Sequence, residues 1–107
     1  MRPRSLADVA RAVEGGCAMP APMKEFVDEL IWHLKSVGWT SDQPFKIVPE
    51  WIEEKPETSD PEFFQYLSSV AVHLAMLAVL PVPEWSLKVP YKRFSYEHFQ
   101  KLWQTFP

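Results

Sequence analysis

The feature that most constrains the fold is a long stretch, between residues 62 and 84, that contains no Asp, Glu, Lys or Arg. Asp60 followed by Pro61 is typical of a helix start, because Asp accepts hydrogen bonds from free amides and Pro fits the first helical position. Capping by Ser59 is an alternative shifted by one residue. The pattern predicts a helix from Pro61 to about Val79, and apolar residues on nearly all its sides indicate that it is buried.

This stretch has two interpretations, since about 20 apolar residues are also enough to span a bilayer. Pro81 and Pro83 shorten the helix, and acidic residues rather than lysines lie at both edges. Four polar residues interrupt the stretch: Gln65, Ser68, Ser69 and His73. These features favour a central core helix in a protein that does not cross a membrane, with other elements covering both of its sides.

Two further helices are predicted before this one. Ser5 can cap the first, which Gly15–Gly16 then ends. The second is expected from Pro22 to Val37, because its apolar residues repeat at spacings of three and four and Gly38 supplies a stop. Both should pack against the central helix.

The segment between residues 39 and 59 contains three prolines and no sustained alternation, so it predicts a packed loop rich in Pro and Trp. One short turn is expected around Pro49 to Glu54, and a brief strand at Lys46 to Val48 is an alternative for which no partner strand is identified. Ser95 can cap a last helix with an aromatic stripe. The expected fold is all-α: one domain over residues 1–107, a compact bundle of four to five helices around the central apolar helix.

Composition narrows the classes of function. A net charge of −3 and a pI near 5.6 argue against direct binding to nucleic acid or to an anionic membrane. The single cysteine, Cys17, cannot form an internal disulfide, which favours a cytoplasmic setting. No phosphate-binding glycine loop, serine elbow or metal-binding spacing is present, and the three histidines fall on three different predicted helices. We therefore expect no cofactor, no metal and no enzymatic activity.

The segment from Glu50 to Glu62 contains six acidic residues and one lysine, a local net charge of −5. It is either a solvated loop that maintains solubility or an acidic face that meets a basic partner. A mixture of aromatic and basic residues follows near the other end, where rings could cap the core or form a binding hot spot. The candidate partner-binding residues are Glu50, Trp51, Glu53, Glu54, Glu57, Trp85, Tyr91 and Arg93.

Three runs in this chain resemble small helical bacterial proteins of uncharacterised function: Glu25–Leu30, Tyr66–Ala75, and Leu80–Trp85 with its Pro-x-Pro-x-Trp turn. The resemblance covers most of the chain from Ser5 onward. It implies a toxin–antitoxin, mobile-element or defence context, and it brings no catalytic motif.

These patterns favour a non-enzymatic, protein-binding domain, such as an antitoxin, immunity protein or inhibitor. Its acidic face would contact a basic toxin or a protein that acts on nucleic acid. The alternative is a homo-oligomeric regulatory module. A third hypothesis is a small enzyme with a dispersed acidic site, which Glu53 or Glu54 buried in a cleft beside His33 or His73 would strongly support.

Overall fold

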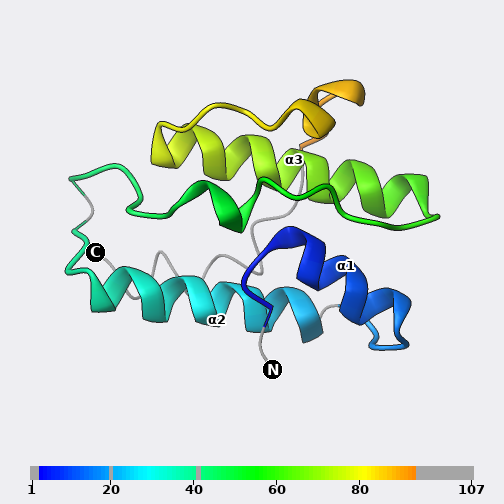
Figure 1. Ribbon diagram of the computed structural model, residues 1–107, viewed down its shortest axis with the longest axis horizontal. Helices are drawn as coiled ribbons and strands as arrows, with labels where there is room; N and C mark the ends of the chain where they lie inside the picture. Colours follow the sequence, from blue (N-terminus) through cyan, green and yellow to red (C-terminus); the bar gives the residue numbers. More distant parts are fainter. Residues whose placement is uncertain (1–2, 20, 41, 94–107) are drawn as a thin grey trace.

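The computed structural model describes residues 3–19, 21–40 and 42–93. These residues form a compact helical fold and contain no strand, so neither the brief strand considered at Lys46 to Val48 nor any other is present among them. The elements, in order, are α1 (Leu6–Glu14), α2 (Ala21–Ser36), the 3-10 helix η1 (Pro49–Trp51), α3 (Pro61–Ala78) and the 3-10 helix η2 (Glu84–Lys88) (Figure 1). The all-α prediction is confirmed for this part of the chain.

The ends of the helices are set by local hydrogen bonds, as the sequence predicted. The Ser5 hydroxyl accepts a hydrogen bond from the Asp8 amide at 3.0 Å. The Asp60 carboxylate accepts from the Glu62 amide at 3.0 Å and from the Phe63 amide at 3.3 Å. Gly38, with φ of 69°, follows the end of α2. Each cap supplies partners to backbone groups that the helix itself leaves unpaired.

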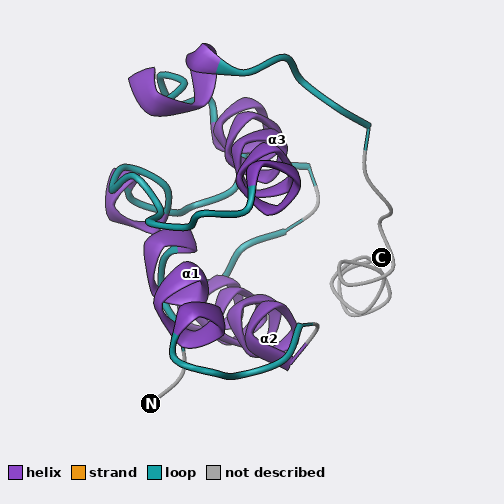
Figure 2. Cartoon of the chain, turned by 90° about the vertical axis from the view of Figure 1, so that its right-hand side faces the viewer, coloured by secondary structure: helices purple, strands orange, loops and turns teal. Residues whose placement is uncertain are grey.

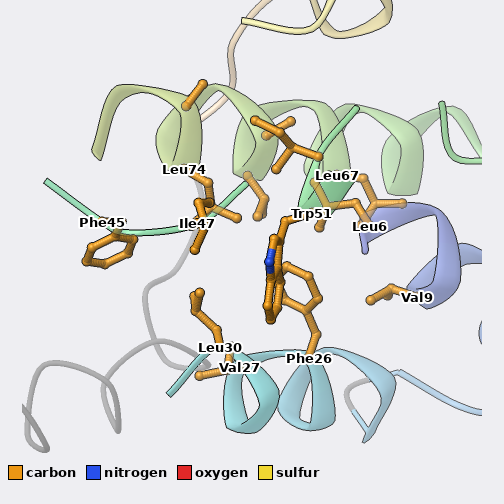
Figure 3. Packing of buried hydrophobic residues seen from close by; sticks show 14 of the residues in the cluster. Leu6, Val9, Phe26, Val27, Leu30, Phe45, Ile47, Trp51, Leu67 and Leu74 are labelled. Atoms are coloured by element: carbon orange, nitrogen blue, oxygen red, sulfur yellow. The ribbon is translucent and has the colours of Figure 1, made fainter. Parts of the chain in front are cut away.

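The loop between α2 and α3 forms the middle of the molecule. Helices α1 and α2 lie on one side of it and α3 lies on the other (Figures 1 and 2). Figure 3 shows Trp51 of the loop between Phe26 of α2 and the apolar face of α3. The loop therefore supplies core side chains to both layers: Trp39, Phe45, Ile47, Trp51 and Ile52 are all buried.

Helix α3 packs against the loop on one side and against η2 and the segment around it on another, and the predicted arrangement of four to five helices around it is not confirmed in the described part of the chain. One face is buried and includes Leu67, Val70 and Leu74, whereas Met76 is 71% exposed. Ser68 and Ser69 are also buried and lie on other sides of the helix, where the segment that follows α3 covers them. The predicted last helix, beginning at Ser95, lies outside the described residues.

The polar residues within α3 attach the following segment to the helix. The Ser68 hydroxyl donates to the Ser86 carbonyl at 2.8 Å, and the Ser69 hydroxyl accepts from the Lys92 amide at 3.0 Å. The Gln65 side-chain amide donates to a carbonyl two residues after η2, that of Pro90, at 3.1 Å. None of the helices in the described part of the chain is long and apolar enough to cross a membrane.

Candidate partner-binding groove

A groove of about 620 Å³ lies between the turn at η1 and the extended segment that follows α3. Pro49 and Ile52 contribute from the turn, while Leu80, Pro83 and Trp85 contribute from the later segment. These side chains are apolar. The groove thus brings together the acidic segment from Glu50 to Glu62 and the Pro-x-Pro-x-Trp turn of Leu80–Trp85, which α3 separates in the sequence.

Trp85 connects the two walls of the groove. Its indole Nε1 donates to the Ile52 carbonyl and to the Glu53 carbonyl, both at 3.1 Å. Its ring lies 5.8 Å, centroid to centroid, from the Phe64 ring of α3, and the side chain is 7% exposed. Trp85 is therefore mainly a structural residue that fixes the turn relative to α3.

The wall formed by residues 80–83 is conformationally restricted. Pro81 and Pro83 each have a fixed φ and no backbone N–H. The Pro83 carbonyl accepts from the Ser86 amide at 3.0 Å and from the Ser86 hydroxyl at 2.6 Å. A ligand here would be recognised through side-chain contacts, since two prolines prevent this segment from pairing as an edge strand.

The charged residues that line the groove are both acidic. Glu53 lies at the end of the turn and Glu84 begins η2, and both are exposed. No cation is among the described residues of the lining. Two carboxylates beside an apolar surface create a negative potential that a cationic group would neutralise.

On the opposite side of the loop, Glu50 and Glu54 line a smaller hollow of about 360 Å³ together with Arg4 and Arg11. The Arg11 guanidinium Nη1 lies 2.8 Å from Glu54 Oε2, and Arg11 also pairs with Asp8 of its own helix. Here the acidic side chains face cations of the same molecule.

Asp8 titrates below its usual range because of this arrangement. Partial burial by itself raises the pKa of Asp8, but hydrogen bonds from the Arg11 guanidinium, the Arg4 amide and Ser5 favour the ionised form, so the pKa lies below 3.8. Hydrogen bonds to Glu54 and then to Asp8 raise the pKa of Arg11. The network stabilises the charged forms of Asp8 and Arg11.

Glu57 lies on a third surface, a shallow hollow that it shares with Lys55 and Phe64. The six acids of the segment from Glu50 to Glu62 therefore do not form one continuous acidic face. Within the described residues, Glu53 is the member of the segment that lines the apolar groove.

Trp51 is one of the predicted partner-binding residues, and the structure places its side chain in the core. The side chain is 3% exposed, and its ring lies 5.8 Å from the Phe26 ring and 5.3 Å from the His33 ring. The Arg4 guanidinium covers it at 5.6 Å from the ring centroid. Its apolar area is used for packing between the layers, which leaves almost none for a ligand.

Tyr91 and Arg93 lie beyond η2, in the segment tied to α3 through Ser69. Tyr91 is 51% exposed and Arg93 is also exposed. Neither is among the described residues of the groove lining. Their contribution to partner binding stays a prediction.

The residues considered for chemistry lie apart from one another. His33 Nε2 lies 2.7 Å from the Lys46 carbonyl oxygen, and burial lowers the pKa of His73. Cys17 is exposed in a separate hollow that Tyr66 also lines, and burial raises the pKa of Tyr66 to about 12. Within the described residues, no three His, Cys, Asp or Glu side chains are grouped so that they could hold a metal ion.

The structure does not bring together the acidic residues that were considered for an enzyme. Glu53 and Glu54 are both exposed, and they line different hollows. Neither hollow includes His33 or His73 among its described residues.

Comparison with known proteins identifies no relative. No protein-family model matches the chain, and no match was found among curated proteins or among solved structures.

The sequence analysis missed Glu84 and the wall formed by residues 80–83. The Pro-x-Pro-x-Trp turn was a visible signal of an unusual structure at this point. The contact between Trp85 and the turn at Ile52, however, joins residues 33 positions apart. No local pattern predicts such a contact.

Proposed function

We propose that this chain is a non-enzymatic, protein-binding domain that contacts a basic partner through the groove between η1 and the segment after α3. The observation that carries the proposal is the composition of the groove: an apolar surface whose charged lining residues are Glu53 and Glu84. A partner segment with an apolar side chain flanked by Lys or Arg is complementary to it. The apolar side chain would fill the groove, and the cations would pair with the two carboxylates.

Charge also decides between classes of partner. Two carboxylates would repel a phosphate backbone, which favours a protein over a nucleic acid. Such a partner fits a toxin or another protein that itself acts on nucleic acid. An antitoxin, immunity protein or inhibitor in the cytoplasm would then use the groove to hold it.

A selection from a phage-displayed library of random dodecapeptides tests the proposal. The immobilised full chain is used as bait, and the affinities of the selected peptides are measured by fluorescence anisotropy. The charge-reversed double variant Glu53→Lys/Glu84→Lys is compared with Glu25→Lys, an exposed acid on α2 that is not part of the groove lining.

We expect the selected peptides to place Lys or Arg around an aliphatic or aromatic residue. The double variant should lower their affinity by about tenfold or more, since each contact between opposite charges contributes on the order of 1 kcal/mol. Glu25→Lys should bind as the native chain does. The proposal fails if no peptide is enriched, if the enriched peptides are acidic, or if both variants behave alike.

Self-association is a second candidate function, favoured by the exposure of large apolar residues. Met76 is 71% exposed and Leu87 is 67% exposed. A homo-oligomeric module would cover such residues with a second copy. Multi-angle light scattering over a range of concentrations distinguishes the two functions, because a monomer at high concentration excludes the module.

A further inference from the structure

Val79, at the end of α3, has a backbone conformation that valine rarely adopts. Its φ is 53° and its ψ is 47°, which is the left-handed region. No other non-glycine residue in the described part of the chain has a positive φ. A side chain branched at Cβ is unfavourable in this conformation, and helices that end in this way usually have Gly at this position.

Val79 is not buried within the chain, so packing does not offset its unfavourable backbone conformation. Its side chain is 75% exposed, the highest exposure among the large apolar residues of the described structure. Met76, whose carbonyl accepts a hydrogen bond from the Val79 amide at 3.3 Å, is 71% exposed. A chain selected for stability alone would gain more from glycine at this position.

The exposed pair leads directly into the groove. Leu80, the next residue, lines it, and the Leu80 amide donates to the Ala75 carbonyl at 2.9 Å, which fixes how the chain leaves the helix. The apolar surface of Met76 and Val79 thus precedes the groove wall along the chain. We call these two residues the α3-end patch.

We propose that Val79 is a contact residue for the basic partner protein, and that the α3-end patch extends the groove surface on which this partner binds. The inference rests on the proposed function, and it adds a requirement to the chemistry of the partner. One apolar side chain fills the groove between Glu53 and Glu84, and a second covers Val79. Burial of Val79 by the partner offsets the unfavourable backbone conformation that the free chain retains.

The variant Val79→Gly separates this role from a structural one. In the full chain it should raise the midpoint of thermal unfolding by about 4 °C, because glycine adopts the left-handed conformation without strain. The same variant should lower affinity for the tightest-binding peptide from the dodecapeptide selection by about fivefold, since the valine contact is lost. A gain in stability combined with a loss of binding is not expected of a purely structural residue.

Two further variants complete the test. Met76→Ala should weaken peptide binding and leave the unfolding midpoint nearly unchanged, because the side chain is exposed in the free chain. Val37→Ala serves as the matched control, since Val37 is an exposed valine after the end of α2 that is not part of the groove lining. Val37→Ala should not change the affinity for the peptide.

If Val79→Gly does not fold, Val79→Asn is used with the same two measurements, because Asn tolerates the left-handed region.

Unchanged affinity in Val79→Gly overturns the inference, and so does a lower unfolding midpoint. Failure of the proposed function is a different result, in which Glu53→Lys/Glu84→Lys binds the selected peptides as tightly as the native chain does. The two failures are therefore distinguishable in one set of proteins.

Discussion

The two sides of the loop between residues 49 and 54 bear similar carboxylates but face different surroundings. On the side of α1, Glu54 pairs with Arg11 at 2.8 Å. On the side of the groove, Glu53 and Glu84 line an apolar surface with no cation among its described residues. On the first side Glu54 is paired with a cation of the same molecule, whereas on the second side the carboxylates are available to a partner. A binding site is therefore indicated by unbalanced charge beside apolar surface rather than by the number of acids in a segment.

The largest expected effect concerns the core that both sides share. Trp51→Ala should lower the free energy of unfolding by about 3–5 kcal/mol, because it removes the ring that fills the space between the layers. Urea unfolding followed by far-UV circular dichroism measures this loss. Trp32→Ala is the control, since Trp32 is 61% exposed on α2, and its effect should stay within about 0.5 kcal/mol. Similar losses in the two variants would contradict the layered core.

A smaller effect is expected from Trp85→Phe, which retains a ring but removes the indole N–H. The carbonyls of Ile52 and Glu53 then lose their shared donor, and the free energy of unfolding should fall by about 1–2 kcal/mol. Peptide affinity should fall as well, because the two groove walls are no longer held together. Trp32→Phe should change neither quantity. Unchanged stability in Trp85→Phe would mean that the indole does not connect the walls.

A weaker, pH-dependent effect is expected on the side of α1. The pKa of Asp8 is lower in the folded chain than its ordinary value of 3.8, so its contribution to stability is present above that pH and is lost as the pH falls through the folded pKa. Arg11→Ala removes a hydrogen bond that favours the ionised form and brings the folded pKa of Asp8 closer to its ordinary value, so the loss of stability on acidification should become smaller. Thermal unfolding between pH 2 and pH 7 measures this. Identical pH profiles for the native chain and the variant would contradict the network.

The sequence predicted the local part of the fold well. Helix starts at Ser5 and Asp60, and the end of α2 before Gly38, depend on hydrogen bonds within a few residues. Such interactions are encoded by residue type and spacing alone. The approximate bounds of all three α-helices followed from them.

The candidate site was only partly predictable, because its geometry depends on contacts between distant segments. The sequence left a packing role and a partner-binding role open for Trp51, because its burial depends on how the loop lies between the helices. The adjacent residues Glu53 and Glu54 could not be assigned to opposite sides without the structure of the turn. The way the loop and the segment after α3 pack against this helix likewise depends on contacts between distant residues, which hydrophobic periodicity does not encode.

The most direct test of the difference between the two sides of the loop applies the same charge reversal to two neighbouring residues, Glu53 and Glu54. Affinity for the selected basic peptide and the midpoint of thermal unfolding are measured for Glu53→Lys and for Glu54→Lys. We expect Glu53→Lys to weaken binding about fivefold or more at unchanged stability. Glu54→Lys should retain the affinity but lose up to about 1 kcal/mol of stability, because it breaks the ion pair with Arg11. Undiminished binding by Glu53→Lys, or a larger loss of binding in Glu54→Lys, would contradict the assignment of the groove as the partner surface.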